Sequence, residues 1–430
     1  MLDLKWVREH PEAVREAARR KHLEVDVDAF LAADAGHREL LGRVEALRAE
    51  LKAASRELGR LTPEERNAVL EEQKARKTRL KELEAQEREL AAEVRRLALL
   101  LPMPPAPGVP DGRDDRANVE LRRVGEPPSF PFEARDHVEL GELLGVLDIP
   151  RGVKIAGTRN YLLLGGLAEL EHAVLQQAVR HMQERGFTLC SVPTLVKDEC
   201  MEGTGYYPGG EEQAYRCERD GLSLVGTSEV PLTSIHAGEV LVEEDLPVRR
   251  IALTPCYRRE AGTYGKDTRG LYRVHQFWKV EQVVIGPADE DWSRAEHERM
   301  LGHATDYMDA LGLPYRVVHV CAGDLGQGQV EKFDIETWMP SRGGYGETHS
   351  ASRFHDFQAR RLDLRYRPSG GGRPRFCHTL NNTVIASPRV LIAILENLQE
   401  ADGGVRIPEV LRPWMGGRER LEPAATPARG

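Results

Sequence analysis

Between about residues 28 and 100 the apolar positions recur at alternating steps of four and three, the spacing of a two-helix coiled coil. Thr62 and Pro63, followed by two glutamates, indicate a helix start between the two halves of this pattern. We therefore expect an antiparallel hairpin with helices roughly 45 Å long. The first apolar seam comprises Leu40, Val44, Leu47, Leu51, Ala54, Leu58 and Leu61, and the second comprises Leu80, Leu83, Leu90, Val94, Leu97 and Leu101, interrupted by Glu87.

After Leu101 a run rich in proline and glycine ends the helical pattern, because proline cannot continue a helix interior. Farther along, short β-rich segments alternate with helical patterns at 168–185 and 291–311. This order predicts an α+β fold with an antiparallel sheet flanked by helices. The expected divisions are an N-terminal domain at 1–101, a linker at 102–119, a larger domain at 120–415 and a tail at 416–430.

One hairpin of the larger domain concentrates charge. An apolar strand from Ile251 leads into a long charged loop, and Phe277, Lys279 and Glu281 then alternate along a returning strand, which places them on one face. An aromatic ring, cations and carboxylates on one sheet face are suited to holding a nucleotide triphosphate beside a small zwitterion. A solvated hairpin with a random charge mixture is the alternative, and the clustering of charge at the strand ends disfavours it.

The net charge of −9 and the pI near 5.9 exclude a global attraction to nucleic acid, so any RNA contact needs a local patch. The outer half of the predicted hairpin contains such a patch. On the pattern alone, RNA binding and plain coiled-coil association are equally good interpretations of it. Its basic residues are Lys74, Arg76, Lys77, Arg79 and Lys81.

Six scattered cysteines without paired spacing disfavour a zinc ribbon or a disulfide framework and suit a reducing, cytoplasmic location. A catalytic zinc held by a spatial cluster of these cysteines stays open. We expect neither a signal peptide nor a membrane span, because the N-terminus is charged and no apolar run is long enough. The glycine motifs of dinucleotide folds and P-loops are absent, so a bound nucleotide must be held in another way.

Several segments together resemble a known family. Residues 254–262 and 267–281 resemble motif 2 of the class II aminoacyl-tRNA synthetases, in the form found in seryl-tRNA synthetases. Residues 226–232 are similar to that family's serine-binding segment, and residues 378–397 to its motif 3. The resemblance covers essentially the whole chain in the right order. It implies ATP- and Mg²⁺-dependent activation of L-serine, and transfer of serine to the 3′ end of tRNA(Ser), and possibly of tRNA(Sec), by a homodimer whose N-terminal arm grasps the tRNA.

The resemblance also implies roles for single residues. Arg258 would bridge the α-phosphate and the serine carboxylate, Arg273 would hold the far phosphates, and Arg389 would cover the adenine or the γ-phosphate. Phe277 would stack on the adenine, although a core aromatic is a fair alternative, and Glu260 would contact its amino edge. The implied ATP-binding set is Arg258, Arg259, Glu260, Arg273, Val274, Phe277, Glu347, Thr348, His349, Ser350 and Arg389, in which Glu347 and Ser350 would hold Mg²⁺.

The serine pocket implied by the resemblance is small and polar, which suits rejection of alanine and glycine through unpaired polar groups. Glu229 or Glu281 would take the ammonium, and Glu281 with Thr383 the hydroxyl. The full set is Thr227, Ser228, Glu229, Glu281, Asn381 and Thr383.

Three positions depart from the family pattern. Ser228 replaces the usual alanine, Arg259 the usual serine, and Gly346 an arginine that often precedes the metal-binding glutamate. The first two changes keep the functional atoms, whereas the third removes a charge. Two rival functions are a paralogue that serves a carrier protein, disfavoured by the full-length arm, and an inactive RNA-binding homologue, disfavoured by the intact motif arginines.

Overall fold

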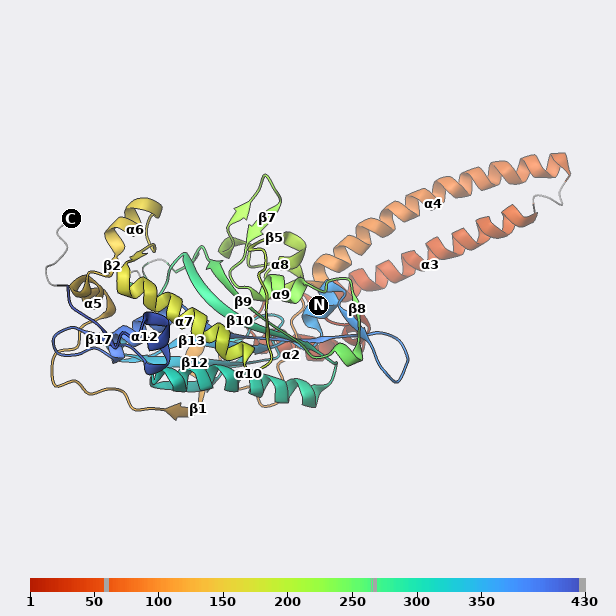
Figure 1. The fold of residues 1–430 in the computed structure, drawn as a ribbon. Helices are drawn as coiled ribbons and strands as arrows, with labels where there is room; N and C mark the ends of the chain where they lie inside the picture. The colour runs from red at the N-terminus through yellow and green to blue at the C-terminus, as the bar shows by residue number, and fades with distance from the viewer. Residues whose placement is uncertain (58–61, 264, 266–268, 425–430) are drawn as a thin grey trace. The chain divides into compact units, whose positions relative to one another are not determined.

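A computed structural model describes residues 1–57, 62–263, 265 and 269–424 (Figure 1). The chain divides into two compact units, residues 1–104 and 105–430. No helix in the described ranges is long and apolar enough to cross a membrane.

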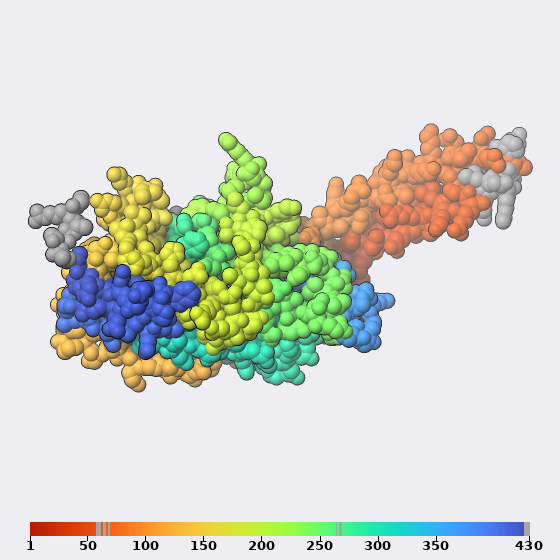
Figure 2. All heavy atoms as spheres, in the orientation of Figure 1, coloured from red at the N-terminus to blue at the C-terminus, as the bar shows by residue number. Residues whose placement is uncertain are grey.

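The first unit is built on the predicted helical hairpin. Leu40, Val44 and Leu83 are buried between the two long helices, and Leu47 and Leu80 pack against them. The side chains of the two helices fill the space between them in the space-filling view (Figure 2). The expected seam positions Leu58 and Leu61 lie outside the described residues. The helices of this unit are α1 (Leu4–Glu9), α2 (Pro11–Arg20), α3 (Val27–Glu57) and α4 (Pro63–Ala98).

Polar contacts also cross this hairpin. Glu87, the polar interruption of the second seam, lies with its Oε1 atom 2.9 Å from His37 Nε2. Arg48 forms an ion pair with Glu84 at 2.8 Å. These pairs fix the register in which the two helices meet, because each joins one position of α3 to one position of α4.

The second unit contains an eight-stranded sheet in the order β1-β11-β12-β13-β16-β10-β9-β4. All neighbours pair antiparallel except β4 and β9, which are parallel. The predicted α+β class with an antiparallel sheet is therefore confirmed. The strands are β1 (Val119–Val124), β4 (Thr188–Leu189), β9 (Val248–Tyr257), β10 (Gln276–Gly286), β11 (Tyr315–His319), β12 (Glu331–Met339), β13 (Gly344–Arg353) and β16 (His378–Ala386).

Helices α7 and α10 cover one face of this sheet (Figure 1). Val280 and Val284 of β10 belong to the same apolar cluster as Val174 of α7 and Met300 of α10. Because successive strand residues point to opposite faces, the alternating Lys279 and Glu281 side chains point away from this core. The helices of the unit are α5 (His137–Leu144), α6 (Ile149–Ala156), α7 (Gly165–Gln183), α8 (Asp198–Thr204), α9 (Glu229–Ser234), α10 (Glu290–Leu311), α11 (Phe357–Leu362) and α12 (Arg389–Asn397).

Small sheets surround the large one. One consists of β15, β14 and β8, a second of β5, β7 and β6, and two-stranded pairs join β2 to β3 and β17 to β18. Their bounds are β2 (Leu147–Asp148), β3 (Leu162–Leu163), β5 (Leu195–Lys197), β6 (Arg216–Cys217), β7 (Leu222–Leu224), β8 (Val240–Val242), β14 (Arg365–Arg367), β15 (Arg375–Phe376), β17 (Val405–Arg406) and β18 (Arg420–Leu421).

Two irregularities in the large sheet determine which residues share a face. Thr348 of β13 has no pairing partner in β12, because Glu347 lies opposite Glu336 and His349 lies opposite Ile335. Such an extra residue is a β-bulge, and it reverses the alternation of side chains along its strand. Glu347 and Ser350, three positions apart, consequently reach the same face. Val384 of β16 is an extra residue of the same kind opposite β10.

Candidate active site

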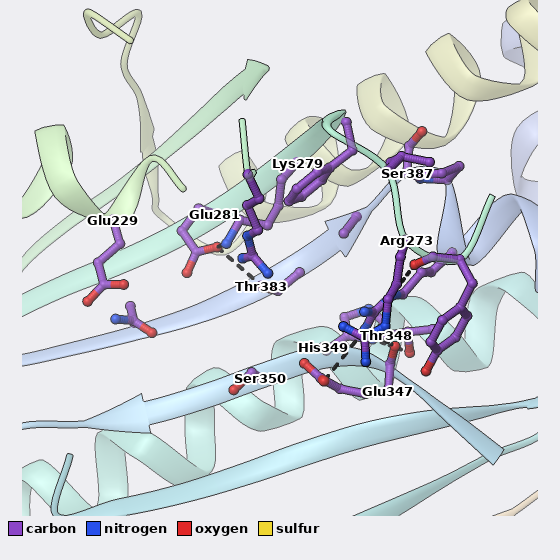
Figure 3. Close-up of a pocket in the computed structure, with 18 of the residues that line it drawn as sticks. Glu229, Arg273, Lys279, Glu281, Glu347, Thr348, His349, Ser350, Thr383 and Ser387 are labelled. Carbon is purple, nitrogen blue, oxygen red and sulfur yellow. Dashed lines mark hydrogen bonds and ion pairs between the residues drawn. The ribbon is translucent and has the colours of Figure 1, made fainter. Parts of the chain in front are cut away.

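A cavity of about 210 Å³ lies on the face of the sheet opposite α7 and α10. β10 contributes Phe277, Lys279 and Glu281 to its lining, as the alternation predicts. β13 and β16 contribute further polar residues, and Arg389 enters from the start of α12. Figure 3 shows Glu229, Glu281 and Thr383 toward one end of the cavity, and Arg273 and Glu347 toward the other.

The cavity unites most of the site residues expected from the sequence. Thr227, Ser228 and Arg259 do not line it. Thr227 Oγ1 instead accepts a hydrogen bond from Glu229 N at 3.2 Å, Ser228 is fully buried, and Arg259 is exposed. The expected residues that do line it are Glu229, Arg258, Glu260, Arg273, Val274, Phe277, Glu281, Glu347, Thr348, His349, Ser350, Asn381, Thr383 and Arg389.

Two carboxylates define one end of the cavity. Glu281 forms an ion pair with Lys279, its neighbour on the same face, and accepts a hydrogen bond from Thr383 Oγ1 at 3.4 Å. Glu229 has no cationic partner among its hydrogen bonds in the described structure. Burial, followed by the charge of Glu281, raises the pKa of Glu229 from 4.5 to about 7. At this end of the cavity the charge of Glu281 is therefore balanced by Lys279, whereas the charge of Glu229 would be stabilised by a cationic ligand.

Arginines and an aromatic ring define the other end. The Arg258 guanidinium carbon lies 5.1 Å from the centre of the Phe277 ring. Arg273 forms an ion pair with Glu260 at 3.5 Å. Guanidinium groups such as these are suited to bind phosphate or carboxylate oxygens in pairs, because their donors lie in a planar fork.

Arg389 is fixed by the segment that carries Glu347. Its Nη1 atom donates to the Glu347 carbonyl at 2.7 Å and lies 3.5 Å from the Glu347 carboxylate. Partial desolvation opposes the charge on Glu347, but Arg389, Lys332 and Arg258 outweigh it and hold the pKa of Glu347 below its ordinary value. The Glu347 carboxylate is therefore ionised, and it lies on the same face as Ser350.

Asp334 of β12 lies opposite Ser350, and its Oδ1 atom is buried without a hydrogen-bond partner in the described structure. Oxygen donors of this kind fit Mg²⁺, which prefers carboxylate and hydroxyl ligands. No group of three or more His, Cys, Asp or Glu residues within the described ranges is arranged to hold a metal ion. The six cysteines, all within these ranges, form no disulfide.

His349 is buried and lines the cavity, and burial lowers its pKa to about 4. The ring is therefore neutral near pH 7. Its Nδ1 atom lies 2.8 Å from Thr348 Oγ1.

Sequence reasoning missed several residues of the lining. Lys279 is visible in the alternation of β10 but was assigned no role, and Tyr206 follows α8 in a segment without a recognised motif. Tyr272 fills the space beside Gly346, where a Cβ atom would lie 3.0 Å from the tyrosine ring and its hydroxyl. The missed residues are Tyr206, Tyr272, Lys279, Gln329, Ser352, Ala386, Ser387 and Pro388.

Comparison with known proteins assigns both units. Residues 1–105 match the seryl-tRNA synthetase N-terminal domain, and residues 215–398 match the tRNA synthetase class II core domain (G, H, P, S and T). A serine–tRNA ligase of Deinococcus radiodurans is 47% identical over 98% of this chain and 99% of its own length. A corresponding ligase of Thermomicrobium roseum is 46% identical over 98% of the chain and 95% of its own length.

A solved structure has the same fold. It is that of seryl-tRNA synthetase from Pyrococcus horikoshii complexed with ATP, which superimposes with a TM-score of 0.92 at 37% identity. The superposition covers 99% of this chain and all of the other.

Proposed function

Because the chain belongs to the seryl-tRNA synthetase family, we propose that its cavity joins L-serine to ATP as seryl-adenylate and then transfers serine to the 3′ end of tRNA(Ser). The observation that carries this proposal is the division of one cavity into a carboxylate end and an arginine end. The carboxylate end fits a small hydroxy acid that bears an ammonium group, and the arginine end fits a nucleotide triphosphate. The enzyme is a class II aminoacyl-tRNA synthetase, a ligase.

In the proposed first step the serine carboxylate attacks the α-phosphorus of ATP and pyrophosphate leaves. The carboxylate is already a nucleophile, so the protein supplies no base, in keeping with the neutral ring of His349. Arg258 would bridge the two anions, Arg273 would bind the outer phosphates, and Arg389 with Phe277 would enclose the adenine. Their contribution is positioning and charge stabilisation.

Glu347 and Ser350 would hold Mg²⁺. Asp334, opposite Ser350, has one oxygen 3.5 Å from Lys332 and one buried oxygen without a hydrogen-bond partner in the described structure, which leaves an acceptor beside this pair. The ion would reduce the negative charge of the phosphates when bound. In the second step the terminal ribose hydroxyl of tRNA would attack the carbonyl carbon of the adenylate, and AMP would leave.

Glu229 would accept the serine ammonium, and Glu281 with Thr383 the serine hydroxyl. Lys279 supports this division, because it already neutralises Glu281 and leaves Glu229 as the carboxylate for an external cation. We further propose that the protein acts as a cytoplasmic homodimer and that the α3–α4 hairpin binds tRNA(Ser). Charging of tRNA(Sec) follows if that tRNA presents the same features.

The proposal is tested by charging bulk tRNA with labelled serine in the presence of ATP and Mg²⁺. Acid-precipitable, tRNA-bound label supports it. Serine-dependent pyrophosphate exchange without tRNA charging would indicate a carrier protein or another acceptor. Absence of both reactions would leave an inactive RNA-binding homologue as the better account.

The raised pKa of Glu229 predicts a pH-dependent affinity for serine. The carboxyl is mostly protonated below about pH 7, whereas the serine ammonium stays charged, so the ion pair weakens as the pH falls. We expect the KM for serine to rise about tenfold between about pH 8 and about pH 6, as the ionised fraction of a group with a pKa near 7 falls. Steady-state pyrophosphate exchange across this range measures it, and a flat profile in the wild type would contradict the assignment. In Glu229→Gln the KM should be higher and independent of pH.

The crowded space around Gly346 predicts that a larger residue at this position would weaken ATP binding. A Cβ atom there would press on Tyr272, whose ring centre lies 4.1 Å from the Arg342 guanidinium carbon and 4.4 Å from that of Arg389. We expect Gly346→Ala to raise the KM for ATP roughly threefold to tenfold through displacement of Arg389, with the KM for serine unchanged. Gly344→Ala on the same strand is the control, since its Cβ atom would have only a backbone oxygen at 3.8 Å. Equal effects of both substitutions would disprove the explanation.

A further inference from the structure

The Glu229 carboxylate is held by two residues, Tyr206 and Gln358, to which the resemblance assigns no role. Tyr206 Oη donates to Glu229 Oε2 at 2.8 Å, and Gln358 Nε2 donates to Glu229 Oε1 at 2.8 Å. Tyr206 follows α8, and Gln358 is the second residue of α11. Each carboxylate oxygen thus has one neutral donor from a different element.

Gln358 is itself fixed by its surroundings. Its Nε2 atom also donates to the Thr204 carbonyl at 3.1 Å, and its Oε1 atom accepts from Thr379 Oγ1 at 2.6 Å. Gln358 is only 1% exposed, so bulk water could not replace these hydrogen bonds if they were lost. The orientation of the amide is therefore determined by α8 on one side and β16 on the other.

A carboxylate has about four acceptor sites, of which these two donors use one on each oxygen. Glu229 lines the cavity, so the unused sites are available there to a ligand. The charged and titratable groups that act on it are Glu281 and Lys279 of β10 and Tyr206 itself. Without the two neutral donors, a buried carboxylate this close to Glu281 would favour its protonated form.

We propose that Tyr206 and Gln358 are positioning residues that hold Glu229 as an ionised, correctly oriented acceptor for the serine ammonium, and thereby determine the affinity for serine. This inference rests on the proposed function and extends it to two residues that the expected site does not include. Both hydrogen bonds favour the ionised carboxylate, and their loss would raise the already elevated pKa of Glu229 further.

The test uses Tyr206→Phe, which removes one hydroxyl and keeps the ring, and Gln358→Met, which removes the amide at similar volume. Each should raise the KM for serine in pyrophosphate exchange about tenfold, the effect of losing one hydrogen bond to a charged group. The kcat and the KM for ATP should stay within about twofold. The pH profile of the serine KM should move to higher pH in both variants.

A second readout separates positioning from general damage. The probe is 3-hydroxypropanoate, which keeps the carboxylate and hydroxyl of serine and lacks its ammonium. Its inhibition constant should be unchanged in both variants, whereas a distorted pocket would bind it less well. Gln282→Met is the matched control, since Gln282 of β10 is also fully buried but donates to the Met300 carbonyl.

Each outcome decides between the alternatives. A serine KM that is unchanged in Tyr206→Phe, or parallel losses for serine and 3-hydroxypropanoate, would overturn the inference. If Gln358→Met does not fold, Tyr206→Phe decides alone, because its ring packing is preserved. Absence of serine-dependent exchange in the wild-type protein would instead refute the proposed function, so the two failures are distinguishable.

Discussion

Replacement of Arg258 by alanine should abolish serine-dependent ATP–pyrophosphate exchange, with a loss in kcat of at least about 100-fold. The reason is that the proposed step brings two anions together, and the Arg258 side chain lines the cavity in which they would meet. Purified protein, saturating serine and labelled pyrophosphate suffice for the measurement. Arg258→Lys should recover only part of the rate, because a single ammonium cannot bind two oxygens in the paired geometry of a guanidinium.

The loss should not come from unfolding. Arg258 is exposed, its Nε atom is 3.4 Å from the Gly226 carbonyl, and its remaining contact is with the Phe277 ring. We expect the free energy of unfolding to change by no more than about 0.5 kcal/mol, as for most surface substitutions. The control is Arg250→Ala on β9, the strand that ends just before Arg258, since the Arg250 side chain donates to the Arg249 carbonyl. Retention of substantial exchange in Arg258→Ala would refute the placement of the α-phosphate.

Shortening the α3–α4 hairpin should have the second large effect. Deletion of residues 48–79, with Leu47 and Leu80 joined by a short glycine-rich turn, removes the outer hairpin and keeps the buried cluster of Leu40, Val44 and Leu83. We expect serine-dependent exchange to stay within about twofold, while aminoacylation of tRNA falls at least about 100-fold through lost phosphate contacts. Unchanged charging of tRNA would mean that the hairpin serves another purpose.

The structure also indicates which charges of the hairpin matter. Arg76 pairs with Glu72, and Arg79 pairs with Glu82. Lys74, Lys77 and Lys81 are exposed at helical steps of three and four, which places them on one face of α4. Substitution of these three lysines by glutamine should raise the KM for tRNA. The slope of log KM against log salt concentration should fall by about two to three, roughly one for each phosphate contact that is lost. The far-ultraviolet circular dichroism should not change, since the helix is intact.

The parts of this molecule that follow a period were predictable. The heptad spacing predicted the helical hairpin. The alternation from Phe277 to Glu281 predicted a strand that returns antiparallel to β9 and the face of that strand that lines the cavity. The resemblance supplied the remaining segments. Strand ends were less accurate: β9 begins at Val248 rather than Ile251, and β10 continues to Gly286.

What could not be predicted depends on contacts between distant segments. Tyr206 and Gln358 meet Glu229 from 23 and 129 positions away along the chain, and no local pattern encodes either contact. The loss of charge at Gly346 was visible, but its occupation by Tyr272 was not. The bulges at Thr348 and Val384 add one residue each to otherwise regular strands, and only the pairing with their neighbours reveals them.

Those two bulges have a consequence for how the cavity can diverge over evolutionary time. On β16, Asn381 and Thr383 precede the extra residue and Ala386 follows it; on β13, Glu347 precedes and Ser350 and Ser352 follow. Each strand therefore presents its cavity-lining residues in two separately phased halves. Substitutions that follow the two-residue alternation in one half leave the face assignment of the other half unchanged. Loss of a bulge residue, by contrast, would exchange core and cavity positions along half a strand at once.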